Sequence, residues 1–403
     1  MNLVIDNENK IIEQTDKYSA NNYKPLPVVI EKGEGVWVYD VNGVKYLDMV
    51  SAYSAVNQGH RHPKIVKSAV EQLDRLTLTS RAFHNDKMGK FLEKACKLSG
   101  FNKAIPMNTG AEAVETAIKL ARKWGYEKKG VENDKAEIVV CNNNFHGRTI
   151  SIISFSTTEQ YKDKFGPHTP GFVSVPFGDE RAIENAINKN TVGVLIEPIQ
   201  GEGGVNIPAE GYLSKVREIT SQNNVLLMLD EIQTGLGRTG KMFCYLHENI
   251  KPDVLILGKA LGGGVYPVSM VLADNNIMDV FVPGDHGSTF GGNPLGAVIG
   301  MASLDVLIDE NLADKAKELG EYFVHKIRGI NSMKVKEIRG KGLLIAVEIK
   351  KEYGKARAYC EELMRLGVLG KDTCGQVIRF APPLVITKDE IDWAIEKIKS
   401  VLT

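Results

Sequence analysis

Two stretches near the middle of the chain decide the fold: Val225-Leu-Leu-Met-Leu-Asp230-Glu-Ile-Gln233 and Pro252-Asp-Val-Leu-Ile-Leu-Gly-Lys259-Ala-Leu-Gly-Gly-Gly264. Each holds a short apolar run of strand length that is followed by a polar residue or a glycine. Similar runs cover 137–141 and 192–196, and segments with helical periodicity cover 111–123, 180–188 and 212–223. Strands that alternate with helices predict an α/β fold with a mostly parallel central sheet flanked by helices. Ligands of such sheets bind beyond the carboxyl ends of the strands.

The segments on either side of this region have a different character. Residues 35–39 and 45–49 are strand-like and flank Asn42-Gly43, which predicts a β-hairpin. The last hundred or so residues alternate helical patterns with short apolar runs, which is typical of an α+β domain. We therefore expect three parts: an N-terminal segment at 1–50 that packs with a smaller C-terminal domain at 296–403, and a large domain at 51–295.

The composition is that of an ordinary globular protein. Hydrophobic residues make up 43% and charged residues 25% of the 403 residues, and both values are close to globular averages. Fifty Lys and Arg balance fifty Asp and Glu, so no net positive charge attracts a nucleic acid or an anionic membrane. The uncharged run at 260–273 contains three consecutive glycines and is shorter than the ~20 apolar residues that span a bilayer. We expect neither a nucleic-acid partner nor a membrane span.

The cysteines and the N-terminus indicate a cytoplasmic protein. The five cysteines are odd in number, widely spaced and never arranged as Cys-x-x-Cys, which is typical of reduced thiols in the cytoplasm. The first ten residues have neither the basic and apolar regions of a signal peptide nor the Arg-rich character of a transit peptide.

Lys259 and Asp230 are the first candidates for catalysis. Lys259 follows an apolar run and a glycine, so partial burial is expected to lower its pKa toward the neutral amine that forms Schiff bases. Asp230 follows the neighbouring apolar run, and a buried carboxylate needs a cationic partner such as a protonated pyridine nitrogen. An aldehyde for the lysine and a ring nitrogen for the aspartate together indicate pyridoxal 5'-phosphate.

This cofactor also needs a site for its phosphate and a surface for its ring. Gly110 and Ala111 open a predicted helix, whose free N–H groups and dipole favour an anion. The same segment fits an ordinary capped helix, with Thr109 and Glu112 placed as in a capping box. Phe145 follows the strand at 137–141 and offers an aromatic face, although taken alone it is more typical of a core residue.

Other cofactor and metal sites are disfavoured. Gly235-Leu-Gly-Arg-Thr-Gly240 matches G-x-G-x-x-G, but the segment that begins Asp230-Glu-Ile-Gln separates it from its strand and no acidic residue follows at the place expected for ribose binding. Hydride transfer on a nicotinamide is therefore the weaker cofactor alternative. Gly258-Lys259 lacks the earlier glycine of a P-loop. The histidines, including His60-Arg61-His62, show no zinc-ligand spacing, so no metal site is expected.

The segments around Asp230 and Lys259 resemble those of the class III aminotransferases, pyridoxal-phosphate enzymes of fold type I, and the resemblance covers essentially the whole chain. It implies that Lys259 forms the Schiff base and carries the proton, and that Asp230 pairs with the pyridine nitrogen. It also implies a homodimer with shared active sites, in which Ser288 and Thr289 reach the phosphate bound by the neighbouring subunit. The implied cofactor-binding residues are Gly110 and Ala111 at the phosphate, Phe145 stacked on the ring, Gln233 near the ring hydroxyl, Asp230, Lys259, Ser288 and Thr289.

Within this family, three segments are most similar to the ornithine aminotransferases: Asn22-Tyr23-Lys-Pro-Leu-Pro, Ser51-Ala-Tyr53-Ser-Ala-Val-Asn-Gln-Gly-His60 and Val377-Ile-Arg379-Phe-Ala-Pro-Pro-Leu384. The resemblance implies that Tyr23 and Arg148 bind the distant α-carboxylate of ornithine, with Tyr53 in the same substrate site. Arg379 would bind the near carboxylate of 2-oxoglutarate as a bidentate pair. Glu202 would cover Arg379 while ornithine is bound, which makes it a catalytic candidate beside Lys259 and Asp230.

The predicted function is therefore transfer of the δ-amino group of L-ornithine to 2-oxoglutarate by a cytoplasmic homodimer. The products would be glutamate and glutamate 5-semialdehyde, which cyclises to pyrroline-5-carboxylate. The nearest alternative is a related enzyme for N-acetylornithine, succinylornithine or 4-aminobutyrate, but Tyr23 and Tyr53 favour ornithine. A non-catalytic ligand sensor of the same fold is the alternative from another class. One departure from the family is Cys374, which stands where relatives usually carry histidine, in the loop before Arg379.

Overall fold

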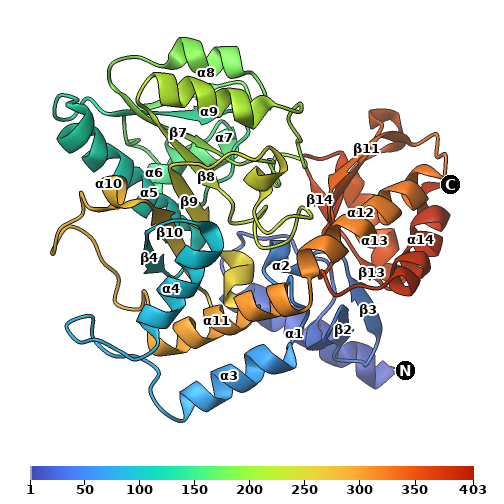
Figure 1. Cartoon of the computed structure of the whole chain (residues 1–403). Helices are drawn as coiled ribbons and strands as arrows, with labels where there is room; N and C mark the ends of the chain where they lie inside the picture. Colours follow the sequence, from blue (N-terminus) through green and yellow to red (C-terminus); the bar gives the residue numbers. More distant parts are fainter. Residues whose placement is uncertain (1) are drawn as a thin grey trace.

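A seven-stranded sheet forms the centre of the protein (Figure 1). The computed structural model describes the chain from residue 2 to residue 403, with side chains described from residue 8 onward. The strand order is β4-β10-β9-β8-β7-β5-β6, and all neighbours from β9 to β6 pair in parallel, whereas β10 runs antiparallel to both its neighbours. The strands are β4 (Lys103–Met107), β5 (Glu137–Cys141), β6 (Phe172–Val175), β7 (Thr191–Ile196), β8 (Leu226–Asp230), β9 (Val254–Leu257) and β10 (Ser269–Ala273).

The predicted parallel strands are confirmed to within one residue. The runs at 137–141 and 192–196 correspond to β5 and β7, and the run at 225–229 is displaced by one, so that Asp230 is the last residue of β8. Every residue of β7, β8 and β9 is buried. Continuous apolar strands of this kind form where a parallel sheet is covered on both faces.

Helices cover both faces of the large sheet. The helices are α1 (Asn2–Tyr18), α2 (Ser51–Ser54), α3 (Pro63–Leu73), α4 (Met88–Ser99), α5 (Gly110–Trp124), α6 (Ile150–Ile153), α7 (Glu159–Lys162), α8 (Glu180–Ala186), α9 (Tyr212–Gln222), α10 (Asn275–Met278), α11 (Pro294–Asp309), α12 (Leu312–Arg328), α13 (Ala356–Arg365) and α14 (Lys388–Leu402), with a π-helix η1 (Gly125–Lys129) and 3-10 turns η2 (Cys244–His247), η3 (Lys259–Gly262) and η4 (Lys351–Tyr353). Leu195 and Met228 point to the core beneath α5, whereas Val194 and Leu227 point to the core shared with α4, α9 and α11. This alternation follows from the two-residue period of a strand.

Two four-stranded sheets lie beside the large sheet (Figure 1). The first has the order β1-β2-β3-β13 and the second the order β11-β12-β15-β14. The predicted hairpin is confirmed as the antiparallel pair β2 and β3, and β3 pairs in parallel with β13, so residues near the two ends of the chain share a sheet. The strands are β1 (Ile30–Glu34), β2 (Trp37–Asp40), β3 (Lys45–Asp48), β11 (Val335–Lys341), β12 (Leu344–Ile349), β13 (Val368–Leu369), β14 (Lys371–Thr373) and β15 (Val377–Phe380).

Helix α11 connects the large sheet to the C-terminal part of the chain. It packs along α3 and α4, and α12, which follows it, packs on β11, β12 and α14. The division of the chain at 50 and 295 stays a prediction. Helix α1 and the antiparallel strand β10 were not predicted from the sequence, and Glu8 of α1 accepts a hydrogen bond from the backbone N–H of Val29 at 3.2 Å.

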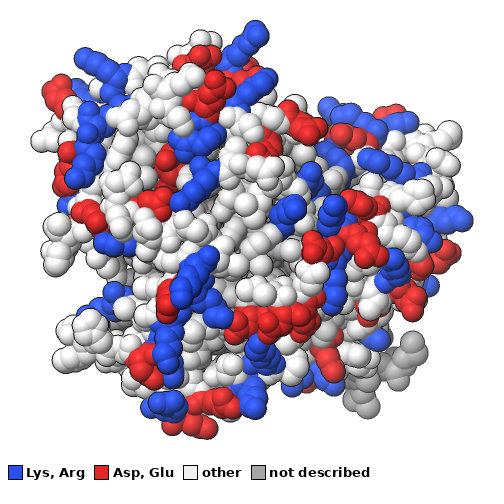
Figure 2. Space-filling model, in the orientation of Figure 1, with Lys and Arg blue, Asp and Glu red and all other residues white. Residues whose placement is uncertain are grey.

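The surface carries charges of both signs. Acidic and basic side chains lie interspersed over the face shown in Figure 2, as expected when fifty residues of each sign balance. Within residues 2–403, none of the helices is both long enough and apolar enough to cross a bilayer.

Candidate active site

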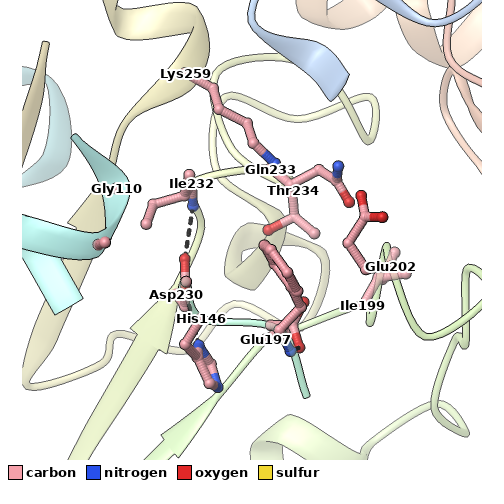
Figure 3. Close-up of a pocket in the computed structure, with 13 residues that line it drawn as sticks. Gly110, His146, Glu197, Ile199, Glu202, Asp230, Ile232, Gln233, Thr234 and Lys259 are labelled. Atoms are coloured by element: carbon pink, nitrogen blue, oxygen red, sulfur yellow. Dashed lines mark hydrogen bonds and ion pairs between the residues drawn. The ribbon is translucent and has the colours of Figure 1, made fainter. Parts of the chain in front are cut away.

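A pocket lies at the carboxyl ends of the parallel strands of the large sheet (Figure 3). Its walls come from β8, from the segments that follow β5, β7 and β9, and from the start of α5. This is the edge at which open α/β sheets bind their ligands. The residues that line the pocket are Gly110, Ala111, Phe145, His146, Gly147, Glu197, Ile199, Glu202, Asp230, Ile232, Gln233, Thr234 and Lys259.

Asp230 and Lys259 reach this pocket from adjacent parallel strands. Asp230 ends β8 and Lys259 opens the turn η3 after β9 with a left-handed backbone, φ 45°. The Asp230 carboxylate is 4% exposed, and its Oδ1 accepts the backbone N–H of Ile232 at 3.0 Å (Figure 3). Burial, with Arg379 as a second contributor, lowers the pKa of Lys259 to about 8 despite the opposing effect of Glu202. A neutral amine is thereby available close to physiological pH.

We call Asp230, Lys259 and Glu197 the floor of the pocket. Glu197 and its buried neighbour His146 were not predicted from the sequence. His146 Nδ1 lies 2.7 Å from Asp230 Oδ2. Burial lowers the pKa of His146, but the hydrogen bond to Asp230 together with the charges of Asp230 and Glu197 outweighs burial, so the net shift is upward. Burial, reinforced by Asp230, raises the pKa of Glu197 to about 7, and Glu197 Oε2 accepts the Phe145 N–H at 2.9 Å. Glu197 directly follows β7, and His146 directly follows the predicted Phe145 in the segment after β5. Because ligands of such sheets bind beyond the carboxyl ends of the strands, both residues could have been identified from the sequence.

Helix α5 places its N-terminus at the pocket. Thr109 caps the helix by accepting the N–H of Glu112 at 3.2 Å, and the reciprocal bond from Thr109 N–H to Glu112 Oε2 is 2.6 Å. The capping-box interpretation is therefore confirmed. It is compatible with a phosphate site, because Gly110 and Ala111 line the pocket and first-turn N–H groups of a helix have no intrahelical acceptor.

The side of the pocket away from the floor contains an ion pair between Glu202 and Arg379. Arg379 is 2% exposed, and its Nη1 lies 2.5 Å from Glu202 Oε1. Burial raises the pKa of Glu202, but Arg379 and then Lys259 outweigh burial and lower it overall. The Arg379 guanidinium also lies 5.3 Å from the centroid of the Tyr53 ring, and Gln233 Nε2 donates to the Tyr53 carbonyl at 3.3 Å. We call Glu202, Arg379 and Tyr53 the gate.

Tyr53 sits in an unusual turn. The four residues of α2, Ser51 to Ser54, have φ angles of 50°, 46°, 60° and 72°, and left-handed backbone costs an L-residue about 1–2 kcal/mol. Asp48 supports the turn, since its Oδ1 accepts the N–H groups of Val50 and Ser51 at 2.8 and 2.9 Å. Strained backbone of this kind persists where the surroundings determine it, commonly at functional sites.

A model described as aminotransferase class-III matches residues 18–402. The chain belongs to the class III aminotransferases. A curated ornithine aminotransferase from Geobacillus sp. (strain WCH70) is 58% identical over 392 residues, which cover 97% of this chain and 98% of that protein. Ornithine aminotransferase 2 of Staphylococcus aureus (strain MRSA252) is also 58% identical, with the same coverage.

Solved structures of this family share the fold. The ornithine aminotransferase from Toxoplasma gondii, described with partial occupancy of PLP at its active site, has a TM-score of 0.97 and 45% identity, and covers 98% of this chain and 94% of that chain. An acetylornithine aminotransferase from Elizabethkingia anophelis has a TM-score of 0.89 and 48% identity, with 98% of both chains covered. Class III aminotransferases use pyridoxal phosphate, and the predicted fold type I is confirmed.

In this class III aminotransferase, six of the predicted site residues do not line the pocket of the single chain. Arg379 and Tyr53 adjoin it through Glu202 and Gln233, and the other four are Tyr23, Arg148, Ser288 and Thr289. The Tyr23 side chain is 76% exposed, and the adjoining Lys24 and Pro25 carbonyls accept hydrogen bonds from Arg357 at 3.1 and 2.8 Å. Arg148 is exposed and stacks on the Tyr161 ring, with its Cζ 3.7 Å from the ring centroid. The substrate roles of Tyr23 and Arg148 stay predictions.

Ser288 and Thr289 do not line the pocket. Asn108 Nδ2 donates to Ser288 Oγ at 2.9 Å, and Thr289 is exposed. A role at the site of a neighbouring subunit stays a prediction.

The glycine motif at 235–240 has a structural role in this aminotransferase. Arg238, which is fully buried within the motif, donates to the carbonyls of Leu343 and Pro382 at 2.9 and 2.6 Å and to Asn57 Oδ1 at 2.5 Å. Gly240 lies against Lys317 of α12, where a Cβ would be 2.9 Å from the Lys317 Cβ. The motif therefore joins the large sheet to the smaller ones.

The residues described with side chains, from residue 8 onward, contain no group of three His, Cys, Asp or Glu placed to hold a metal ion. Cys374, the departure from the family, is exposed, and its Sγ lies 3.4 Å from the carbonyl oxygen of Glu202.

Proposed function

We propose that this class III aminotransferase binds pyridoxal 5'-phosphate and transfers the δ-amino group of L-ornithine to 2-oxoglutarate. Glutamate and glutamate 5-semialdehyde, which cyclises to pyrroline-5-carboxylate, would be the products. The observation that carries the proposal is the gate, in which Glu202 covers the buried Arg379 at 2.5 Å. The identity of 58% to curated ornithine aminotransferases over nearly the whole chain supports it.

The residues of the pocket fit this cofactor. Lys259 and Asp230 line the same pocket as the first two residues of α5. Gly201 keeps the pocket clear, since a Cβ there would be 1.4 Å from Gln233 Oε1. The buried hydroxyl of Thr234, which lines the pocket, has no hydrogen-bond partner among the described residues. A ligand with polar groups along an aromatic ring is consistent with these features.

Bound pyridoxal phosphate supplies an aldehyde that accepts an amino group and a ring that withdraws electrons from the substrate carbon. The chain's own residues then have separate tasks. Lys259 Nζ, whose pKa is about 8, can accept a proton near neutral pH and return it. The Asp230 carboxylate, held by His146 and by the Ile232 N–H, presents a fixed negative charge to a protonated ring nitrogen.

The gate explains how one pocket can accept two differently shaped substrates. Ornithine brings a terminal amine without a neighbouring carboxylate, so Arg379 needs Glu202 as its counter-charge during that half-reaction. Glutamate and 2-oxoglutarate carry a carboxylate next to the reacting carbon, which would replace Glu202 on Arg379. A buried arginine left without an anion would be costly, so one of the two carboxylates must always be present.

A second candidate is transfer from N-acetylornithine, since the acetylornithine aminotransferase from Elizabethkingia anophelis is 48% identical to this chain. Both functions need the same floor and the same gate. They differ at the α-nitrogen, which is a free amine in ornithine and an amide in N-acetylornithine, and Tyr23 is the residue predicted to bind this end of ornithine. Tyr23→Ile is expected to slow the ornithine half-reaction at least tenfold and to leave the glutamate half-reaction within twofold.

The deciding experiment follows the transferred nitrogen. Protein loaded with pyridoxal phosphate is incubated with 2-oxoglutarate and ornithine labelled with ¹⁵N at the δ-amine, and the products are identified by mass. Labelled glutamate and unlabelled pyrroline-5-carboxylate are expected. Ornithine labelled at the α-amine is the matched control and should give unlabelled glutamate. Faster turnover of N-acetylornithine, or unlabelled glutamate together with a labelled cyclic imine from ornithine labelled at the δ-amine, would overturn the proposal.

We further propose that two copies of this chain form a cytoplasmic homodimer with shared active sites. The exposed Phe83 and Phe290 lie on segments joined by a hydrogen bond from Arg81 Nη1 to the Gly291 carbonyl at 3.1 Å. Because Ser288 contacts Asn108 beside the pocket, a partner that covers these aromatic rings would approach the phosphate end. Light scattering should give twice the 44.4 kDa chain mass, and a monomeric active enzyme would contradict the proposal.

A further inference from the structure

The loop that carries the gate glutamate is held from outside by donors to its carbonyl groups. The loop runs from Gln200 to Asn206 and closes at its base by two backbone hydrogen bonds between these residues, at 3.1 and 3.0 Å. Thr373 Oγ1 donates to the Glu202 carbonyl at 2.6 Å. Arg339 donates twice, from Nη2 to the Gly204 carbonyl at 2.7 Å and from Nε to the Val205 carbonyl at 3.1 Å. We call Thr373 and Arg339 the carbonyl clamp.

The clamp and Arg379 belong to the same four-stranded sheet. Arg339 of β11 pairs with Ala346 of β12, and Ala346 pairs with Arg379 of β15, so Arg339 and Arg379 lie in one row across the strands. Thr373 ends β14, which is the other neighbour of β15. One rigid sheet therefore fixes both the arginine of the gate and the backbone of the glutamate that covers it.

The loop needs such external contacts because of its composition. Three of its residues, Gly201, Gly203 and Gly204, are glycines, which lose more conformational freedom on ordering than any other residue. Gly203 cannot be replaced freely, since a Cβ there would be 2.9 Å from the Asn143 carbonyl oxygen. A loop that must contain glycine at these places depends on its partners to hold Glu202 in one position.

The clamp acts on the backbone of this loop without competing for the Glu202 carboxylate. Arg339 has its own counter-charges, because its Nη1 lies 2.8 Å from Glu337 and 2.7 Å from Glu348. Its remaining donors face the loop carbonyls. The carboxylate of Glu202 is thus left to Arg379, and its carbonyl oxygen accepts from Thr373 at 2.6 Å and, more weakly, from Cys374 Sγ at 3.4 Å.

We propose that Thr373 and Arg339 are positioning residues that set how firmly Glu202 covers Arg379, and thereby the balance between ω-amine substrates and substrates with a carboxylate beside the reacting carbon. The inference rests on the proposed function. Loss of the clamp frees the glycine-rich loop, so Arg379 is covered for a smaller fraction of the time. Dicarboxylates then bind more tightly, and the half-reaction that needs a covered arginine slows.

The test uses the holoenzyme and the variant Thr373→Val, which removes the hydroxyl donor at nearly constant volume, with Thr373→Ser as the matched control. Glutarate, a dicarboxylate without an amine, is the binding probe. We expect glutarate to bind about fivefold more tightly to Thr373→Val, the factor that corresponds to one ordinary hydrogen bond. Thr373→Ser should bind glutarate as the wild type does. Arg339→Gln should shift the affinity in the same direction, and Arg339→Lys less so.

Single-turnover rates supply the second readout. The ratio of the ornithine to the glutamate half-reaction should fall about fivefold in Thr373→Val and recover in Thr373→Ser. Unchanged glutarate affinity in folded Thr373→Val and Arg339→Gln, or equal losses in both half-reactions, would overturn the inference. Because glutarate binding requires no turnover of ornithine, a wild type that ignores ornithine would refute the proposed function while leaving the clamp testable.

Discussion

The floor of the pocket and its gate are built in different ways. The floor residues Asp230, Lys259 and Glu197 end or follow adjacent parallel strands of one sheet. The gate joins Glu202 of a loop after β7 to Arg379 of β15, which lies 177 residues further along the chain, and to Tyr53 of the left-handed turn. The floor is therefore held by one sheet, whereas the gate depends on contacts between separate sheets.

This difference suggests separate duties. A floor held by a single buried sheet changes little during turnover, which suits groups that must keep their pKa values and positions. A gate assembled from a glycine-rich loop, a strained turn and a strand of a separate sheet can exchange one ionic partner for another. Changes to the floor are therefore expected to have larger effects than changes to the gate.

Lys259→Ala should abolish the function of the floor. Loss of the amine that holds the cofactor and moves the proton is expected to lower kcat at least about 10⁴-fold. The measurements are steady-state turnover and borohydride trapping of the cofactor on the protein. Turnover within tenfold of the wild type would show that another group performs these tasks.

The pH dependence of cofactor uptake tests the environment of the floor. Because the pKa of Lys259 is lowered to about 8, the neutral amine should increase about tenfold per pH unit below pH 8 and level off above it. The rate at which apoenzyme combines with pyridoxal phosphate should rise about 50-fold from pH 6 to pH 8, where half of the amine is neutral. A rate that keeps rising to pH 10 would mean that burial does not lower this pKa.

Arg379→Lys should slow the half-reaction with glutamate and leave the half-reaction with ornithine nearly unchanged. Lysine keeps the charge but cannot form the bidentate pair with a carboxylate. The second-order rate constant for glutamate is expected to fall about 10- to 100-fold, and that for ornithine less than threefold. Arg217→Lys is the matched control, since Arg217 of α9 pairs with Asp253 at 2.6 Å. This variant should leave both rates within twofold.

Ala52→Gly should have the smallest effect, and it tests whether the turn at residues 51–54 is left-handed. Ala52 is exposed and has φ 46°, so glycine removes steric strain but adds chain entropy to the unfolded state. A net gain of about 0.5–1 kcal/mol in the free energy of unfolding is expected from denaturant titration. Ala358→Gly, at an exposed position inside the right-handed helix α13, should instead lose about 1 kcal/mol. Equal losses in both variants would contradict the left-handed turn.

The residues of the floor follow more directly from local sequence patterns than the residues of the gate. Asp230 and Lys259 follow apolar runs whose burial and parallel pairing are strong local signals. His146 and Glu197 follow the same rule but were missed, because a single polar residue after a strand is common. Arg238 lies in a glycine motif whose packing partners come from the turn between β11 and β12 and from the segment after β15.

The sequence alone determined the order of strands and helices, the residues that end the strands and, through their chemistry, the kind of cofactor. These properties follow from hydrophobic periodicity and strand ends, which act over a few residues. The resemblance to the family implied that Glu202 covers Arg379, and the two side chains are paired in the structure. Only the tertiary structure decided that the chain turns left-handed at Tyr53 and that the clamp holds the loop from a neighbouring sheet. Such contacts depend on how separate sheets pack, and local sequence preferences do not specify that packing.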